Sequence, residues 1–333
     1  MEFDLSEDQR EIKTVARDFL ASRCKLDDVR AAAVSGEYDE GLWKEICELG
    51  WPGIATPEAD GGQGLGMVEL ALISEELGYA CAPTPFLGSV IASLVLSAGA
   101  SDEQKARWLP GLANGEVRGS AVVVGKAPWL AVDLPGSSVI CLPDGQGNGL
   151  LGDPSELKAE DAGLIDATRR YSLVDVPDGF GEELPPEHID GVLRSEVAVA
   201  AEMLGLAQRA MEMGVEYARD REQFGRPIGA YQGVSHRCAQ MLYDVEETRS
   251  LVYYAAWCAD SEPESLRLAA SMAKARASAA SWSVVTSSLQ VHGGIGFTWE
   301  HDLQFFLKRA RVDGEVLGDA DLHEERVAEL VGL

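Results

Sequence analysis

The sequence lacks an apolar run of the roughly 18 residues that a membrane-spanning helix needs. Its first ten residues are acidic and polar, unlike a secretory signal. We therefore expect a cytoplasmic protein. A hydrophobic content of 46% and a charged content of 25% over 333 residues are typical of a globular chain of one to three domains.

Cysteine and histidine are scarce and scattered. None of the six cysteines forms a C-x-x-C pair, so we expect buried free thiols. The five histidines show no paired spacing, which argues against a zinc site. The sequence predicts no metal centre.

Positive charge is also in short supply. The chain has 28 lysines and arginines against 55 acidic residues, which gives a net charge of −27. This balance argues against nucleic acid, whose affinity comes mostly from basic contacts to phosphate, and against anionic membranes. A small anionic ligand is not excluded, because a few placed arginines can bind it locally.

Three regions of the sequence differ in the pattern of their apolar residues, and we place the domains at 1–116, 117–187 and 188–333. The first has apolar residues at helical spacing, with a capping box formed by Ser101 and Gln104. The second has short β-rich runs, "SAVVV", "SVICL" and "YSLVDV", separated by turns. The third has long helices, predicted at 192–219, 234–260 and 265–291, with a final helix at 303–312. The alanine-rich helix at 265–291 favours close helix packing and oligomerisation.

Two glycine-rich stretches are interpreted as turns. "GGQGLG" at 61–66 follows no strand and lacks dinucleotide-loop spacing, and "GQGNG" at 145–149 is predicted to be a hairpin turn. Neither a G-x-S-x-G motif nor a Walker loop is present in the sequence.

Three further segments occur in a specific order: "GWPGIATPEADGGQGLGMVELALISEELGYA" (50–80), "ARDREQFGRPIGAYQGVSH" (218–236) and "QVHGGIGFTWEHDLQFFLKRAR" (290–311). Together they resemble the acyl-CoA dehydrogenase family. The resemblance implies a mainly α fold with a small β-domain: an N-terminal helical domain, a truncated middle β-domain and a C-terminal four-helix bundle that is the oligomer core. It also implies α,β-desaturation of an acyl-CoA thioester, in which a carboxylate removes the α proton and the β hydride passes to FAD.

The same resemblance implies a set of cofactor-binding residues. Arg221 matches an arginine that contacts the FAD pyrophosphate held mainly by a neighbouring subunit, and a guanidinium fork suits a diphosphate. Phe224 would pack beside the adenosine, and Gly225 would let the chain turn. The remaining matched residues are Gln223, Gln232, Gln290, Gly293 and Gly294. The competing interpretation is a helix-end salt bridge for Arg221 and ordinary helix C-caps for the glycines.

The catalytic base departs from the family pattern. The two positions that carry the glutamate in different members are occupied here by Leu317 and Ser195. Leucine cannot accept a proton, and serine is no base without a partner. Nearby carboxylates are Glu196, Glu315 and Asp319, while Glu202 is interpreted as structural. The β region also lacks a T-E-P-x-x-G-S-D-like segment and is short for the family.

The sequence therefore resembles the short, non-catalytic subunit of a heteromeric (α2β2) actinobacterial acyl-CoA dehydrogenase. We expect it to contribute FAD contacts to a longer catalytic partner, with a bulky, steroid-type acyl-CoA as substrate. Two alternatives stay open: a stand-alone flavoenzyme with a relocated base, and a scaffold protein without flavin.

Overall fold

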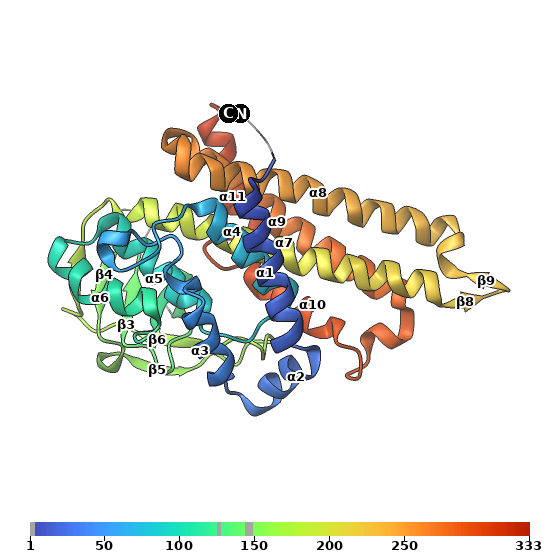
Figure 1. The fold of residues 1–333 in the computed structure, drawn as a ribbon, viewed down its shortest axis with the longest axis horizontal. Helices are drawn as coiled ribbons and strands as arrows, with labels where there is room; N and C mark the ends of the chain where they lie inside the picture. The colour runs from blue at the N-terminus through green and yellow to red at the C-terminus, as the bar shows by residue number, and fades with distance from the viewer. Residues whose placement is uncertain (1–3, 125–127, 144–148) are drawn as a thin grey trace.

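The computed structural model describes residues 4–124, 128–143 and 149–333. Figure 1 shows a small sheet at the lower left and long helices that run from the centre of the molecule to the right. The N-terminal region contains α1 (Glu7–Arg23), α2 (Leu26–Ser35), α3 (Glu40–Glu48), α4 (Met67–Tyr79), α5 (Phe86–Gly99) and α6 (Asp102–Asn114). The C-terminal region contains α7 (His188–Asp220), α8 (Gln232–Ser261), α9 (Pro263–His292), α10 (Leu303–Asp313) and α11 (Ala320–Leu330).

The sheet lies between these regions in the sequence. It has seven strands in the order β5-β6-β2-β1-β3-β4-β7, and β1 and β3 form the one parallel pair among those described. The strands are β1 (Gly119–Val124), β2 (Trp129–Val132), β3 (Val139–Leu142), β4 (Gly149–Gly152), β5 (Lys158–Asp161), β6 (Tyr171–Asp175) and β7 (Glu182–Leu184). The expected mainly α fold with a small β-domain is confirmed.

Several element predictions need correction. The β-rich runs correspond to β1, β3 and β6, but strands β2, β4, β5 and β7 were missed. All four residues of β5 are exposed, so the strand carries no apolar alternation. The helix at 303–312 is not the final one, because α11 follows it. That helix buries only His323 among its residues and therefore lacks a clear apolar face. The predicted turn at 145–149 falls largely outside the described residues.

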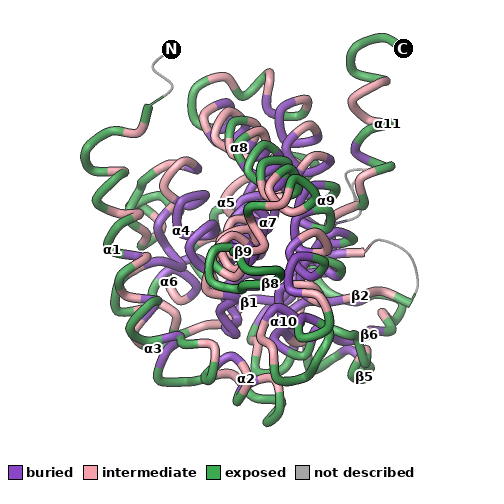
Figure 2. The backbone as a smooth tube through the Cα atoms, turned by 90° about the vertical axis from the view of Figure 1, so that its right-hand side faces the viewer, coloured by how far each residue is buried: buried purple, intermediate pink, exposed green. Residues whose placement is uncertain are grey.

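Two helices meet backbone to backbone in the core. A Cβ atom on Gly205 of α7 would lie 1.9 Å from the carbonyl oxygen of Glu75 on α4, and one on Gly78 would lie 2.0 Å from that of Glu202. No side chain fits either position. Figure 2 shows the buried segments of α4 and α7 at the centre of the molecule.

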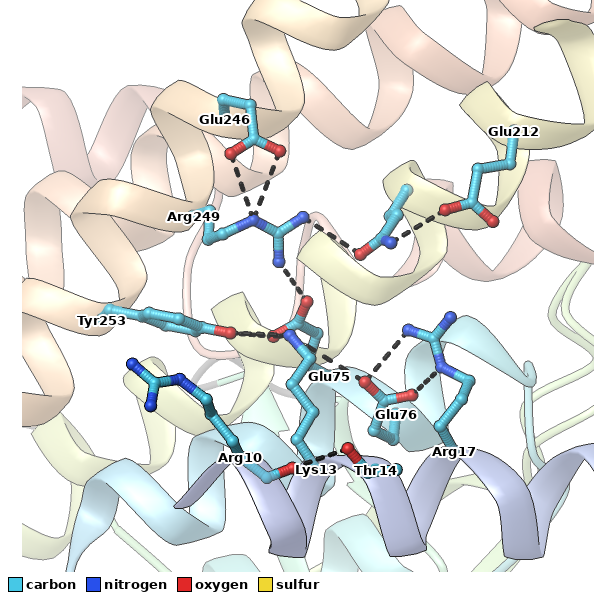
Figure 3. A network of polar contacts seen from close by, with 11 residues as sticks. Arg10, Lys13, Thr14, Arg17, Glu75, Glu76, Glu212, Glu246, Arg249 and Tyr253 are labelled. Carbon is cyan, nitrogen blue, oxygen red and sulfur yellow. Dashed lines mark hydrogen bonds and ion pairs between the residues drawn. The ribbon is translucent and has the colours of Figure 1, made fainter. Parts of the chain in front are cut away.

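A buried ionic cluster joins the N-terminal region to the C-terminal helices (Figure 3). Glu75 of α4 accepts hydrogen bonds from Lys13 of α1 at 2.8 Å and from Tyr253 of α8 at 2.7 Å, and it also pairs with Arg249. Burial by itself would raise the pKa of Glu75, but Lys13 and Arg249 outweigh it and the pKa falls. The carboxylate therefore stays charged and anchors three helices.

The remaining sequence expectations concern thiols and membranes. All six cysteines are free; four are buried, and Cys47 and Cys238 are half-buried. Among residues 4–124, 128–143 and 149–333, no helix is long and apolar enough to cross a bilayer.

Candidate functional site

The end of α7 turns into a two-stranded hairpin, β8 (Glu222–Gln223) and β9 (Arg226–Pro227). Its two central residues, Phe224 and Gly225, have φ values of +54° and +79°. Two-residue hairpin loops of this kind require positive φ at both positions, which glycine adopts freely and phenylalanine does not. Phe224 is nonetheless 93% exposed, so core packing does not explain why it is there.

Arg221 follows the last residue of α7 and is exposed. Its backbone N–H donates to Tyr217 and its carbonyl accepts from Ile228, so the hairpin base is fixed. Within the described part of the chain, no carboxylate lies within 4 Å of its guanidinium. The salt-bridge interpretation of Arg221 therefore finds no support, and the group is available to an anion from outside this chain.

The second glycine-rich motif lies at the same end of the bundle. The ring of His292, at the end of α9, stacks on Tyr217 of α7 with 4.6 Å between centroids. Gly293 has φ +64° and caps α9, as the competing interpretation expected. Yet Cβ atoms on Gly225, Gly293 or Gly294 would meet no heavy atom within 4 Å. These backbones are open, which suits close approach of a ligand.

The glutamines differ in their local contacts. Gln223 lies in β8, where its side-chain amide donates to the carbonyl of Glu222 at 2.8 Å. Gln232 begins α8, and Gln290 lies in the last turn of α9; both are exposed. The hairpin residues and the α9 motif thus share one end of the bundle, and contact of any of them with FAD stays a prediction.

Sequence reasoning missed two exposed aromatic residues beside this motif. Phe297 and Trp299 are 76% and 74% exposed. Arg30 of α2 donates to the carbonyl oxygens of Trp299 at 2.6 Å and Glu300 at 3.2 Å, and the Lys308 ammonium lies 4.1 Å from the Trp299 ring centre. The signal was present in "FTWEHD", directly after the glycines.

Neither of the two positions at which family members carry the catalytic glutamate has a side chain that can act as a base here. Ser195 is fully buried in α7, and its hydroxyl donates to the carbonyl of Gly191 at 2.7 Å. Leu317 lies between α10 and α11 with φ +57°. Its backbone N–H donates to Val123 of β1 at 2.8 Å, and its carbonyl contacts the His323 ring at 3.1 Å. The loop that carries Leu317 is therefore held against the sheet.

A buried lysine holds the same loop. Lys274 of α9 donates to the carbonyl oxygens of Gly318 at 2.9 Å and Gly314 at 3.2 Å. Burial lowers the pKa of Lys274 to about 8. With two loop carbonyls and the Ser278 hydroxyl as acceptors, this ammonium is a structural clamp.

The other candidate carboxylates already have structural partners. Glu196 is buried and accepts from Arg326 at 2.9 Å, and burial raises its pKa. Glu315 pairs with Arg311 on the surface, and Asp319 caps α11 by accepting from Leu322 at 2.8 Å. Glu315 and Asp319 line a cavity of about 250 Å³, but all three carboxylates are already bonded within the chain.

Glu202 belongs to a buried network of five charges. Its carboxylate accepts from Arg169 at 2.5 Å and from Arg309 at 2.9 Å, while Arg169 also pairs with Asp313 and Arg309 with Asp166. Burial raises the pKa of Asp313 to about 7. The structural interpretation of Glu202 thus agrees with its contacts. The other members were missed because they lie far from Glu202 in the sequence.

Comparison with known proteins identifies the family of the chain. The model of the acyl-CoA dehydrogenase C-terminal domain matches residues 192–332, and that of the N-terminal domain matches residues 6–116. Acyl-CoA dehydrogenase IpdE2 of Mycobacterium tuberculosis is 32% identical over 93% of each chain.

Solved structures have the same fold. A variant of the Tcur3481-Tcur3483 steroid ACAD superposes with a TM-score of 0.86 at 26% identity, covering 98% of each chain. The ChsE4-ChsE5 complex from Mycobacterium tuberculosis gives a TM-score of 0.88 at 22% identity, covering all of both chains, and at that identity shows the fold alone. The chain belongs to the acyl-CoA dehydrogenase family.

Proposed function

We propose that this chain is the non-catalytic subunit of a heteromeric, FAD-dependent acyl-CoA dehydrogenase. The observation that carries the proposal is the pair of base positions. Leu317 cannot accept a proton, and Ser195 is buried with its hydroxyl already bonded to Gly191. A base must reach the α proton at about 3 Å, directly or through one water. The three other candidate carboxylates, Glu196, Glu315 and Asp319, are already bonded within the chain.

The residues at the hairpin end fit the diphosphate part of FAD. Arg221 lacks a carboxylate partner in the described chain, and the backbone at Gly225, Gly293 and Gly294 is open. When bound, FAD supplies the hydride acceptor for the desaturation. This chain's contribution would be to bind the ADP end of that cofactor, with Arg221 paired to the pyrophosphate and Phe224 against the adenosine.

The partner would be a longer family member that carries the catalytic glutamate, in a heterotetramer located in the cytoplasm. The Tcur3481-Tcur3483 structure named above carries two protein names and is described as a steroid ACAD. We therefore propose a bulky, steroid-type acyl-CoA as the substrate.

The test is to purify this chain with the longer family member and to mutate carboxylates on each side. Glu196→Gln, Glu315→Gln and Asp319→Asn here should leave acyl-CoA-dependent dye reduction within about twofold. Replacing the partner's matching glutamate should lower it by about 10²–10⁴, the usual contribution of general-base catalysis. Loss of activity with one of the first three variants, at unchanged FAD content and assembly, would show a relocated base. A complex that binds no FAD would point to a scaffold.

A further inference from the structure

A cavity of about 1020 Å³ lies between the loop joining α2 to α3 and the β5–β6 edge of the sheet. Its lining includes Tyr38, Arg118, Ser137, Asp166, Arg169 and Arg170. The volume lies at the upper end of the range for small-molecule sites. The cavity has no role in the function proposed above.

Arg170 is the unusual residue of this cavity. Its guanidinium lies 5.4 Å from the centre of the Tyr38 ring and makes one hydrogen bond, to the carbonyl of Ala32 at 3.4 Å. Within the described residues no carboxylate lies within 4 Å of it, although the chain has 55 acidic residues. A half-buried guanidinium without an anion is a ready binding group for a carboxylate or phosphate.

A second donor points to the same chemistry. Arg169 lines the cavity and is 95% buried, as its exposed fraction is 5%. Its terminal nitrogens bond to Glu202 and Asp313, but its Nε–H has no acceptor among the described residues. Buried donors almost always have a partner, so an orphan of this kind calls for an acceptor in the cavity.

The charges of the cavity are divided between its interior and its mouth. The buried Asp166 pairs with Arg309, and Arg118 pairs with the exposed Glu40, so Arg170 is the cation left unbalanced in the described lining. At the mouth, Glu37, Glu160 and Asp161 are exposed. A ligand with one anionic group near Arg170 is therefore favoured, and a ligand with further anionic groups is repelled by the carboxylates at the mouth.

The cavity is separate from the position of the family's base. Arg118 directly precedes β1, whereas Leu317 contacts Val123 near the other end of that strand. Leu317 and Ser195 are not among the residues that line the cavity.

We propose that this cavity binds a small monocarboxylate that carries hydroxyl or amino groups. The carboxylate would face Arg170 and Arg169, and the hydroxyl or amino donors would face the carboxylates of the mouth. The proposal does not depend on the function proposed above.

Gluconate, a polyhydroxy monocarboxylate, is the probe, with inorganic phosphate and citrate as polyanionic comparisons. Thermal unfolding of the full chain should shift upward and saturably with gluconate, because a ligand bound to the folded state stabilises it. Arg170→Gln should weaken the gluconate affinity by about ten- to a hundredfold, as expected for a charged hydrogen bond. Arg107→Gln is the matched control, since Arg107 also stacks on an aromatic ring but pairs with Glu182.

A surface variant keeps the test valid if Arg170→Gln does not fold. Glu160→Ala removes one carboxylate acceptor at the mouth and should weaken gluconate binding, whereas Glu156→Ala, exposed and outside the cavity lining, should not. No shift with gluconate would overturn the proposal. Equal affinity in Arg170→Gln and wild type would do the same, and so would binding of phosphate or citrate without gluconate.

Discussion

The backbone nitrogen of Leu317 donates to the carbonyl oxygen of Val123 over 2.8 Å, and this hydrogen bond fixes the loop between α10 and α11 against β1. Leu317 adopts φ +57°, a conformation that L-residues with side chains disfavour by roughly 1–2 kcal/mol. The contacts of Lys274 and His323 with this loop hold that conformation in place. The backbone geometry of the loop is thus maintained although its side chain cannot act as a base.

Restoring a carboxylate at this position is predicted not to create activity in the isolated chain. Leu317→Glu keeps the backbone hydrogen bond to Val123. A base alone does not give activity, because the substrate and the flavin must also be bound within reach of it. Acyl-CoA-dependent dye reduction by Leu317→Glu should equal that of Leu317→Gln, which has the same shape without the charge. Turnover by the glutamate variant alone would show that this chain holds a complete site.

The Lys274 clamp should make stability depend on alkaline pH. The pKa of Lys274 falls from 10.5 to about 8 through burial, so the native state binds fewer protons than the unfolded state between these values. Stability contributed by this residue therefore rises with pH across that window, by about 3 kcal/mol in total at 1.36 kcal/mol per pKa unit.

The measurement compares urea unfolding of wild type and Lys274→Met at pH 7, 8, 9 and 10. The difference in unfolding free energy between the two proteins should change in favour of wild type as the pH rises. A difference that stays constant would mean that Lys274 titrates normally.

Whether a feature of this molecule could be predicted from the sequence depends on how far apart its residues lie in the chain. Arg221, Phe224 and Gly225 are consecutive or nearly so, and a contiguous motif makes them candidates without knowledge of the fold, while their contact with FAD stays a prediction. The buried network could not be found in this way, because Arg169 bonds to Glu202 at a separation of 33 residues and to Asp313 at 144. Its members also occur among other charged residues that are exposed, so nothing local distinguishes them.

The buried network should contribute strongly to stability. Glu202→Gln keeps the shape but removes the carboxylate that Arg169 and Arg309 share, leaving each arginine with one aspartate, Asp313 or Asp166. Breaking a buried ion pair typically costs about 3–5 kcal/mol. Glu216→Gln, at an exposed position of the same helix, should change the unfolding free energy by less than about 0.5 kcal/mol. Chemical denaturation of both variants tests this, and similar losses in the two would show that the network is energetically neutral.

The placement of FAD is tested most directly at the hairpin. Arg221→Ala removes an exposed guanidinium that has no carboxylate partner within the described chain, so the fold should keep its unfolding free energy within about 0.5 kcal/mol. Affinity of the two-chain complex for FAD should fall by about 1.5–3 kcal/mol, the usual contribution of a charged hydrogen bond.

The flavin absorbance per complex, measured after dilution or dialysis, reports this loss. Arg267→Ala, an exposed arginine near the start of α9, is the matched control and should retain flavin as wild type does. Phe224→Asn adds a second test, because asparagine accepts positive φ and preserves the hairpin while removing the aromatic ring. If Arg221→Ala and Phe224→Asn both keep wild-type flavin content, the cofactor does not contact this end of the bundle.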